Sequence, residues 1–255
     1  MSEPASPSAG AASSLPGASA LPVAMGSLPP GYRALVVGAS GAIGAAFVDH
    51  LRADPGCAAV VPLSRRTDPA LDLADEAGIA AAAARLAAQG PWHLLIVATG
   101  LLHGPGLMPE KRLADLSFEA LQRVFKVNVF GPALLLRHFA PLLARERALV
   151  GLLSAKVGSI GDNRLGGWYA YRASKAALNM VVRTTAIELG RAQPRTVLAA
   201  LHPGTVRSGL SRPFRGDEIG GAPALAAARM LQVLDSLQAA DSGSFLAYDG
   251  SRLPW

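Results

Sequence analysis

Residues 33–53 read RALVVGASGAIGAAFVDHLRA, and this stretch decides the fold. An apolar run typical of a buried strand ends in a glycine-rich turn, after which apolar residues recur at helical spacing. The glycines allow a tight turn and a close approach to a pyrophosphate, which the free N–H groups of a helix N-terminus can bind. The alternative is a turn that binds nothing, but a strand before and a helix after are the context that a phosphate site requires. The predicted binding residues are Gly38, Ser40, Gly41, Ile43 and Gly44.

The same alternation of strand and helix continues to the C-terminus. Short continuous apolar runs, typical of buried parallel strands, are separated by longer segments with helical periodicity. We therefore predict an α/β fold, a single Rossmann-type domain with a doubly wound parallel sheet and helices on both faces. The expected strands are 33–38, 58–63, 94–98, 148–153, 196–201 and 244–248, with one more short strand before Asp72, and the expected helices are 42–53, 74–89, 113–145, 168–191 and 222–240.

The first 30 residues differ in composition from the rest of the chain. They are mainly Ala, Pro, Ser and Gly, and they contain no lysine or arginine. Such a stretch buries too little apolar surface to offset the entropy lost on ordering, so we predict a disordered tail over 1–30 and one domain over 31–255. The lack of basic residues argues against a secretory signal or a transit peptide. A start codon assigned too far upstream is the other explanation.

The composition limits the classes of function. The chain has a formal net charge of +6, carried by scattered basic residues without a basic block or an aromatic-basic stripe, so we expect no nucleic-acid partner. No apolar run approaches the roughly 18 residues that span a bilayer, so no membrane partner is expected. Cys57 is the only cysteine, which fits a reducing cytoplasm, and the five histidines lack metal-ligand spacing, so no metal site is expected.

The end of the second expected strand bears on the choice of coenzyme. An NAD site usually has an acidic residue here, whereas this chain has Ser64 followed by Arg65 and Arg66. The charge and forked donors of arginine suit a 2′-phosphate, which favours NADP(H) over NAD(H); the alternative is a solvated basic turn. Asp72 is either an acceptor for the adenine amino group or the N-cap of the next helix. The small residues Ala98, Thr99 and Gly100 follow a later strand, where a cofactor would cross the sheet edge.

A tyrosine and a lysine stand four residues apart in the expected helix 168–191. Tyr171 and Lys175 would lie on one face of that helix, one turn apart. A nearby ammonium lowers the pKa of a phenol from its usual ~10, so the phenol could exchange protons near neutral pH. This property suits protonation of a carbonyl oxygen as a hydride reaches the carbon. An isolated pair of this kind is more typical of an exposed helix surface, so its meaning depends on the rest of the chain.

From about Arg33 to its end, the chain resembles a short-chain dehydrogenase/reductase, and within that superfamily the C-factor-like and sniffer-like carbonyl reductases. Each motif alone is weak, but together and in this order they are highly specific. The motifs are the glycine turn at 38–44, Ala-Thr-Gly at 98–100, Lys-Val-Asn-Val at 126–129, Gly-Ser-Ile at 158–160, Gly-Trp-Tyr-Ala-Tyr-Arg-Ala-Ser-Lys at 167–175, His-Pro-Gly-Thr-Val at 202–206 and Asp-Gly-Ser-Arg-Leu-Pro-Trp at 249–255.

The resemblance implies an NADP(H)-dependent oxidoreductase that moves a hydride between the nicotinamide and a small-molecule carbonyl or alcohol. Tyr171 would be the general acid in reduction and the base in oxidation. Lys175 would bind the nicotinamide ribose and lower the pKa of Tyr171. Asn128 would mark a break in its helix and hold a water that links Lys175 to solvent. The residues that would pass close to the nicotinamide are Pro203, Gly204 and Thr205.

The family also uses a serine to hold the substrate carbonyl, and this serine does not align cleanly. It is commonly the second of a Ser-Ser pair just past the fifth strand, and counting back from Gly158 places Ala155 there. Ser154 is its neighbour and Ser159 lies in the following loop. We take Ser154 as the candidate and Ser159 as the alternative. If neither hydroxyl reaches the carbonyl, the loss of one oxyanion donor would cost on the order of 10²–10³ in rate.

Two further expectations concern specificity and assembly. The loop 205–222 is long enough to form a lid, and its arginines, Arg207, Arg212 and Arg215, either contact an acidic substrate or are solvated. The resemblance implies a homodimer or homotetramer through the expected helices 113–145 and 168–191. It also leaves an alternative from another class, a cofactor-binding regulatory or cell–cell signalling protein with weak or no turnover.

Overall fold

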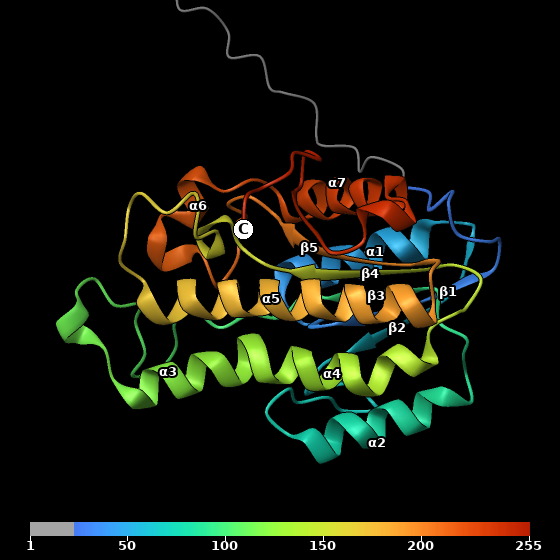
Figure 1. Cartoon of the computed structure of the whole chain (residues 1–255), viewed down its shortest axis with the longest axis horizontal. Coiled ribbons are helices and arrows are strands. Elements are labelled where there is room, and N and C mark those ends of the chain that lie inside the picture. The colour runs from blue at the N-terminus through green and yellow to red at the C-terminus, as the bar shows by residue number, and fades with distance from the viewer. Residues whose placement is uncertain (1–22) are drawn as a thin grey trace, which may run out of the picture.

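The apolar runs form one six-stranded sheet in the computed structural model, which describes residues 23–255 (Figure 1). The strand order is β2-β1-β3-β4-β5-β6, and every neighbouring pair is parallel. The prediction of a doubly wound Rossmann-type sheet is therefore confirmed. The strands are β1 (Tyr32–Val37), β2 (Cys57–Leu63), β3 (Leu94–Val97), β4 (Ala148–Leu153), β5 (Thr196–His202) and β6 (Ser244–Ala247).

Helices cover both faces of the sheet, as the alternating side chains of the strands require. In β1, Ala34 and Val36 join the core on one face, while Leu35 and Val37 join the core on the other. Helices α1 (Ala42–Ala53) and α7 (Pro223–Ser236) cover the first face. The second face is covered by α2 (Glu76–Ala87), α4 (Gly131–Phe139) and α5 (Tyr169–Ala192), which lie on the opposite side of the sheet in Figure 1.

The expected helix 113–145 is broken into several pieces. It comprises a 3₁₀ turn (Leu113–Asp115), α3 (Phe118–Phe125), a π-helical turn (Lys126–Phe130), α4 and a second 3₁₀ turn (Ala140–Leu142). The wide turn precedes Gly131, where an added Cβ would lie only 2.4 Å from the Leu73 Cβ, so the helix passes very close to the chain that leads into α2. The strand expected before Asp72 is also absent from the described residues, where a single bridge between Ser64 and Ala70 stands in its place.

Part of the expected tail packs on the domain. Val23, Met25 and Leu28 are buried against α1 and α7. The Met25 N–H donates to Asp54 Oδ2 at 3.0 Å, and the Ser27 N–H donates to Asp235 Oδ1 at 3.0 Å. These contacts offset the ordering entropy of the segment, so the predicted boundary at residue 30 is wrong for residues 23–30. Residues 1–22 lie outside the described part of the chain.

The carboxyl ends of the central strands converge at one edge of the sheet. The order of strands reverses between β1 and β3, which is the position where open α/β sheets leave a crevice for a ligand. The segments that follow β1, β3, β4 and β5 all contain predicted site residues. None of the helices in residues 23–255 combines the length and apolarity needed to span a bilayer.

Candidate active site

The glycine turn after β1 is shaped by close backbone contacts. Gly38 has φ +84°, and a Cβ there would lie 2.7 Å from the Ala98 carbonyl oxygen. A Cβ on Gly44 would lie 2.1 Å from the Gly38 oxygen, so only glycine fits at the point where α1 leaves the turn. The first turn of α1 has no side-chain cap and no acidic residue. Its free N–H groups and positive dipole end therefore suit an anion such as a pyrophosphate.

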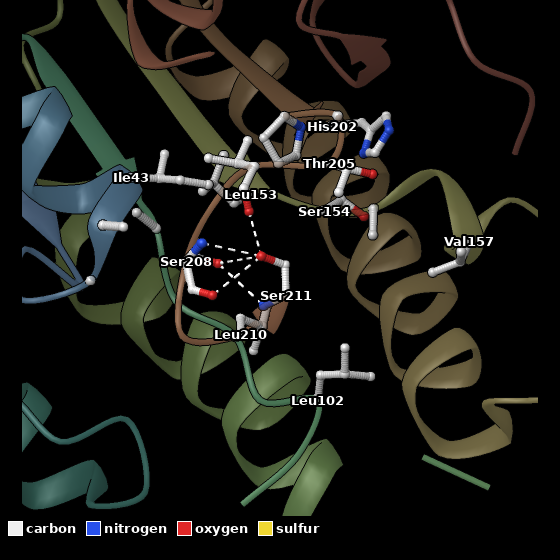
Figure 2. A pocket seen from close by; sticks show the side chains of 18 of the residues that line it. Ile43, Leu102, Leu153, Ser154, Val157, His202, Thr205, Ser208, Leu210 and Ser211 are labelled. Carbon is white, nitrogen blue, oxygen red and sulfur yellow. Dashed lines mark hydrogen bonds between the residues drawn. The ribbon is translucent and has the colours of Figure 1, made fainter. Parts of the chain in front are cut away.

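A cavity of about 690 Å³ lies at this edge of the sheet and brings most of the predicted residues together (Figure 2). It is lined by the glycine turn, the segments after β3 and β4, helix α5 and the loop 205–222, called the lid loop below. Thr99 Oγ1 is buried here and has no hydrogen-bond partner within residues 23–255. The predicted residues that line the cavity are Ser40, Gly41, Ile43, Ala98, Thr99, Gly100, Ser154, Tyr171, Lys175, Pro203, Gly204 and Thr205.

Tyr171 and Lys175 both face this cavity from α5 and are not an exposed helix pair. Both side chains are buried, with 7% and 2% of their surface exposed. The Lys175 Nζ donates to the Leu153 carbonyl oxygen at 2.8 Å and lies 5.8 Å from the centre of the Tyr171 ring. Gly158 packs directly on this part of α5, because a Cβ there would lie 2.6 Å from the Lys175 Cβ. The loop after β4 thus fixes the position of the lysine.

Burial governs the titration of both groups. It raises the pKa of Tyr171 to about 12 and lowers the pKa of Lys175 to about 8. The expected lowering of the Tyr171 pKa by Lys175 is therefore not what the structure shows, because desolvation disfavours the charged form of each group. At neutral pH the phenol is therefore protonated and its O–H can donate, although the raised pKa makes it a weaker acid than a phenol in water.

Asn128 lies in the π-helical turn and holds several segments together. Its side chain accepts from the Leu101 N–H at 2.7 Å and donates to the Leu101 carbonyl oxygen at 2.9 Å. It also donates to Ser174 Oγ at 3.0 Å, and that hydroxyl donates to the Tyr171 carbonyl oxygen at 2.8 Å. Asn128 is fully buried and does not line the cavity. Its side-chain amide is thus engaged in tying the segment after β3 to α5.

The two candidate serines differ in position. Ser154 is buried at the cavity wall, and its Oγ donates to Asn179 Oδ1 at 2.6 Å. Ser159 does not line the cavity; its Oγ accepts from the Asp162 N–H at 3.1 Å within a loop turn. Ala155 lines the cavity but has no hydroxyl. Of the two serines, only Ser154 therefore adjoins the space beside Tyr171.

The residues predicted to select the coenzyme lie beyond the wall of this cavity. Ser64 follows β2, beside the glycine turn, because the Gly38 N–H donates to the preceding Leu63 carbonyl oxygen at 2.8 Å. Arg65 is exposed and has no ion pair with a carboxylate of residues 23–255. Asp72 accepts from the Ala74 N–H at 2.9 Å, whereas the N-cap of α2 is Asp75. The helix-cap interpretation of Asp72 is therefore wrong.

The lid loop contains more local structure than the sequence indicated. It includes a 3₁₀ turn (Arg212–Phe214) and the short helix α6 (Gly216–Ile219), and hydrogen bonds between Ser208 and Ser211 close its first part (Figure 2). Arg212 pairs with Asp217 at 3.3 Å, and Arg215 pairs with Glu218 at 2.8 Å. The three arginines, Arg207, Arg212 and Arg215, do not line the cavity, so the structure gives no support for their contact with an acidic substrate.

Sequence reasoning missed three side chains of the site. Trp168 precedes α5 with φ 52°, and its ring centre lies 4.9 Å from that of Phe214 in the lid. The glycine pair before Trp168 was the available signal, because Gly166 and Gly167 also have positive φ. His202 ends β5 at the cavity wall, and burial, together with the charge of Lys156, lowers its pKa to about 4. The cavity thus combines an aromatic wall with a neutral imidazole.

Comparisons with known proteins agree with this arrangement. Residues 46–253 match a family model described as enoyl-(acyl carrier protein) reductase. The chain is 34% identical over 188 residues to 1-hydroxy-2-glutathionyl-2-methyl-3-butene dehydrogenase of a Rhodococcus species, covering 74% of this chain and 80% of the relative. It is 39% identical over 149 residues to the C-signal protein of Myxococcus xanthus, covering 56% and 83%.

Solved structures with the same fold include two that contain the phosphorylated coenzyme. An NADPH-bound carbonyl reductase from chicken fatty liver has a TM-score of 0.75 and 27% identity, with coverage of 89% of this chain and all of that one. A Burkholderia multivorans structure with bound NADP has a TM-score of 0.74 and 26% identity, with coverage of 89% and 100%. The carbonyl reductase Sniffer of Drosophila melanogaster, at 22% identity and TM-score 0.76, covers 88% and 99% and shares the fold.

Proposed function

The chain belongs to the short-chain dehydrogenase/reductase family of oxidoreductases, and we propose that it is an NADP(H)-dependent reductase of carbonyl compounds. One observation carries the proposal: a buried tyrosine and lysine face the same cavity as an anion-binding glycine turn. Their shared cavity at the carboxyl edge of the sheet suits a dinucleotide together with its substrate. Helix α7 and the segment 23–30 pack with α1 on the opposite face of the sheet from α5.

Several residues at the cavity have the chemistry that NADP(H) would need. The N–H groups at the start of α1 would hold the pyrophosphate, and the unpartnered Thr99 hydroxyl offers a donor where the cofactor crosses the sheet edge. Lys175 would bind the nicotinamide ribose, with Pro203 and Thr205 forming the adjoining wall. Asp72 would accept from the adenine amino group. The bound cofactor supplies the hydride.

Tyr171 then acts as the proton donor. The phenol is protonated at neutral pH, so its O–H is available to the carbonyl oxygen as negative charge develops there. Ser154 would hold the same oxygen from the end of β4. Asn128 would act indirectly, by fixing the segment after β3 against α5 through Leu101 and Ser174. The water that the resemblance implies would need a partner other than the engaged side-chain amide.

The test of this function is consumption of NADPH. Purified protein should quench or shift NADPH fluorescence on binding, and the signal should decay when aldehydes, ketones, quinones or a glutathionyl conjugate with a carbonyl group are added. The last compound enters the panel because a relative of this chain is named for a glutathionyl substrate. The regulatory alternative is favoured by the similarity to the C-signal protein and by the missing hydroxyl at Ala155. Binding without decay on any compound would support that alternative and overturn the reductase.

Coenzyme preference is expected to depend on Arg65. We propose that Arg65, which is exposed and lies two residues after the Leu63 carbonyl that accepts from the Gly38 N–H, binds the 2′-phosphate. Arg65→Ala should weaken NADPH binding about 10- to 100-fold, the value of a charge-assisted hydrogen bond or two, with little change for NADH. Fluorescence titration with both coenzymes measures this. Arg145→Ala removes the same charge from an exposed position near the start of β4 and is the control; equal losses for the two coenzymes in Arg65→Ala would contradict the assignment.

An exposed apolar surface is expected to form an interface between copies of this chain. Phe118, Phe130, Met180 and Ile187 are all large and exposed, and they lie on α3, the π-helical turn and α5. We propose a homodimer or homotetramer through this layer. Met180→Glu would place a charge in that interface and should yield the monomer mass in light scattering at micromolar protein. Leu165→Glu, on a loop outside this layer, is the control; an unchanged assembly in Met180→Glu would rule this surface out.

A further inference from the structure

Asn179 continues the row of buried polar side chains that begins with Tyr171 and Lys175. The three residues follow each other at steps of four along α5 and therefore share one face of the helix. Asn179 is 3% exposed, and its Oδ1 accepts the Ser154 hydroxyl proton at 2.6 Å. The amide is thus positioned between the helix that bears the acid and the strand end that bears the candidate serine.

The hydrogen bonding of this pair is incomplete as it stands. A serine hydroxyl has one proton, so a Ser154 that donates to Asn179 cannot also donate to a ligand in the cavity. Meanwhile Asn179 Nδ2 is buried and has no hydrogen-bond partner within residues 23–255. A buried N–H group without a partner costs free energy. The opposite amide orientation is therefore favoured once another acceptor for the serine proton is present.

A half-turn of the amide resolves both deficits. Rotation about the Cβ–Cγ bond exchanges Oδ1 and Nδ2 in nearly the same space, after which Nδ2 can donate to Ser154 Oγ. The serine proton is then released from Asn179. Ser154 already adjoins the cavity, and its main chain is fixed because its N–H donates to the Leu201 carbonyl oxygen at 2.8 Å. Only the hydroxyl proton needs to change direction.

We propose that Asn179 is a positioning residue whose side-chain N–H directs the Ser154 hydroxyl proton into the cavity, toward the carbonyl oxygen that Tyr171 protonates. The inference rests on the proposed reductase function. In family members with a serine at the position of Ala155, that serine holds the substrate carbonyl oxygen. In this chain the pair Ser154–Asn179 would hold it instead. The carbonyl oxygen of the substrate replaces Asn179 Oδ1 as the acceptor of the serine proton. The Ser154 hydroxyl therefore keeps an acceptor when the substrate binds.

Asn179→Asp tests the direction of this hydrogen bond. A carboxylate only accepts, so it would hold the Ser154 proton permanently and deprive the substrate oxygen of it. We expect kcat to fall on the order of 10²–10³, as for Ser154→Ala, with NADPH affinity and KM nearly unchanged. The double variant Ser154→Ala/Asn179→Asp should be no slower than Ser154→Ala, because the two changes remove one interaction. Additive losses, or a wild-type kcat in Asn179→Asp, would overturn the proposal.

A second variant keeps the test decisive if the aspartate prevents folding. In Asn179→Leu, leucine has a volume similar to that of asparagine and removes both the donor and the acceptor. The Ser154 hydroxyl proton is then no longer directed into the cavity, but it is not held by an acceptor outside it either. Its kcat should fall on the order of tenfold, the value of one ordinary hydrogen bond, and remain above that of Ser154→Ala. A wild-type rate in Asn179→Leu would overturn the inference. Tyr171→Phe distinguishes failure of this inference from failure of the proposed reductase function. If Tyr171→Phe is inactive while Ser154→Ala is fully active, the reductase function is supported and the role of the Ser154–Asn179 pair is refuted.

Discussion

Tyr171→Phe should lose roughly 10²–10⁴-fold in kcat for every carbonyl substrate that the protein accepts, because the substitution removes the proton that the substrate oxygen needs. The phenyl ring keeps the buried position of the phenol and its edge contact with Trp168, whose ring centre lies 6.2 Å away. NADPH affinity should therefore be nearly unchanged. The measurement is single-turnover decay of NADPH fluorescence, with the affinity taken from a titration of the same variant.

A matched control lies two residues earlier in the same helix. Tyr169 is 37% exposed, and the residue four positions after it is Ala173 rather than a lysine. Tyr169→Phe removes an identical hydroxyl from α5 and should leave kcat unchanged. If Tyr171→Phe retains the wild-type rate, the phenol is not the acid, whatever Tyr169→Phe does.

Gly44→Ala should disrupt both stability and cofactor binding. The new Cβ would lie 2.1 Å from the Gly38 oxygen and 2.8 Å from the Gly38 carbonyl carbon, so the backbone of the turn or of α1 must move. The expected loss in the free energy of unfolding is about 3 kcal/mol, at the upper end of overpacking effects in well-packed sites. Displacement of the first N–H groups of α1 should also weaken NADPH binding on the order of 10²-fold. Denaturant unfolding and fluorescence titration measure the two effects.

Two other glycines separate these effects from the general consequence of adding a methyl group. A Cβ on Gly190 meets no atom of residues 23–255 within 4 Å other than those of its own helix backbone, and this glycine lies inside α5, so Gly190→Ala should stabilise the protein by about 0.5–1 kcal/mol. A Cβ on Gly41 would lie 3.4 Å from the Gly38 oxygen, an ordinary contact. Gly41→Ala should therefore fold normally, so any loss of NADPH affinity in this variant would come from the space that the new methyl group takes from the pyrophosphate. A Gly44→Ala protein as stable as wild type would contradict the packing argument.

Much of the fold was predictable because its signals are local. Parallel strands buried on both faces appear as short apolar runs, and six of the seven expected strands match observed ones to within one or two residues, while the short strand before Asp72 is only a single bridge. The glycine turn was predictable for the same reason, since strand, turn and helix occupy about twenty consecutive residues. The π-helical turn at Lys126–Phe130 was visible only through the resemblance, because apolar spacing continues through it. The boundary of the tail was wrong because Val23, Met25 and Leu28 find their partners on α1 and α7.

The sequence alone determined the sheet, the glycine turn and the spacing of Tyr171 and Lys175, since each depends on residues that are neighbours in the chain. The tertiary structure alone decided the burial and the hydrogen-bond partners of those residues. Burial raises the pKa of Tyr171 instead of lowering it. The packing of α5 beside the end of β4 brings Ser154 to Asn179, whereas Ser159 lies outside the cavity. The physical reason is that desolvation and hydrogen-bond partners depend on segments that are distant in the chain, and no local pattern encodes which of them will meet.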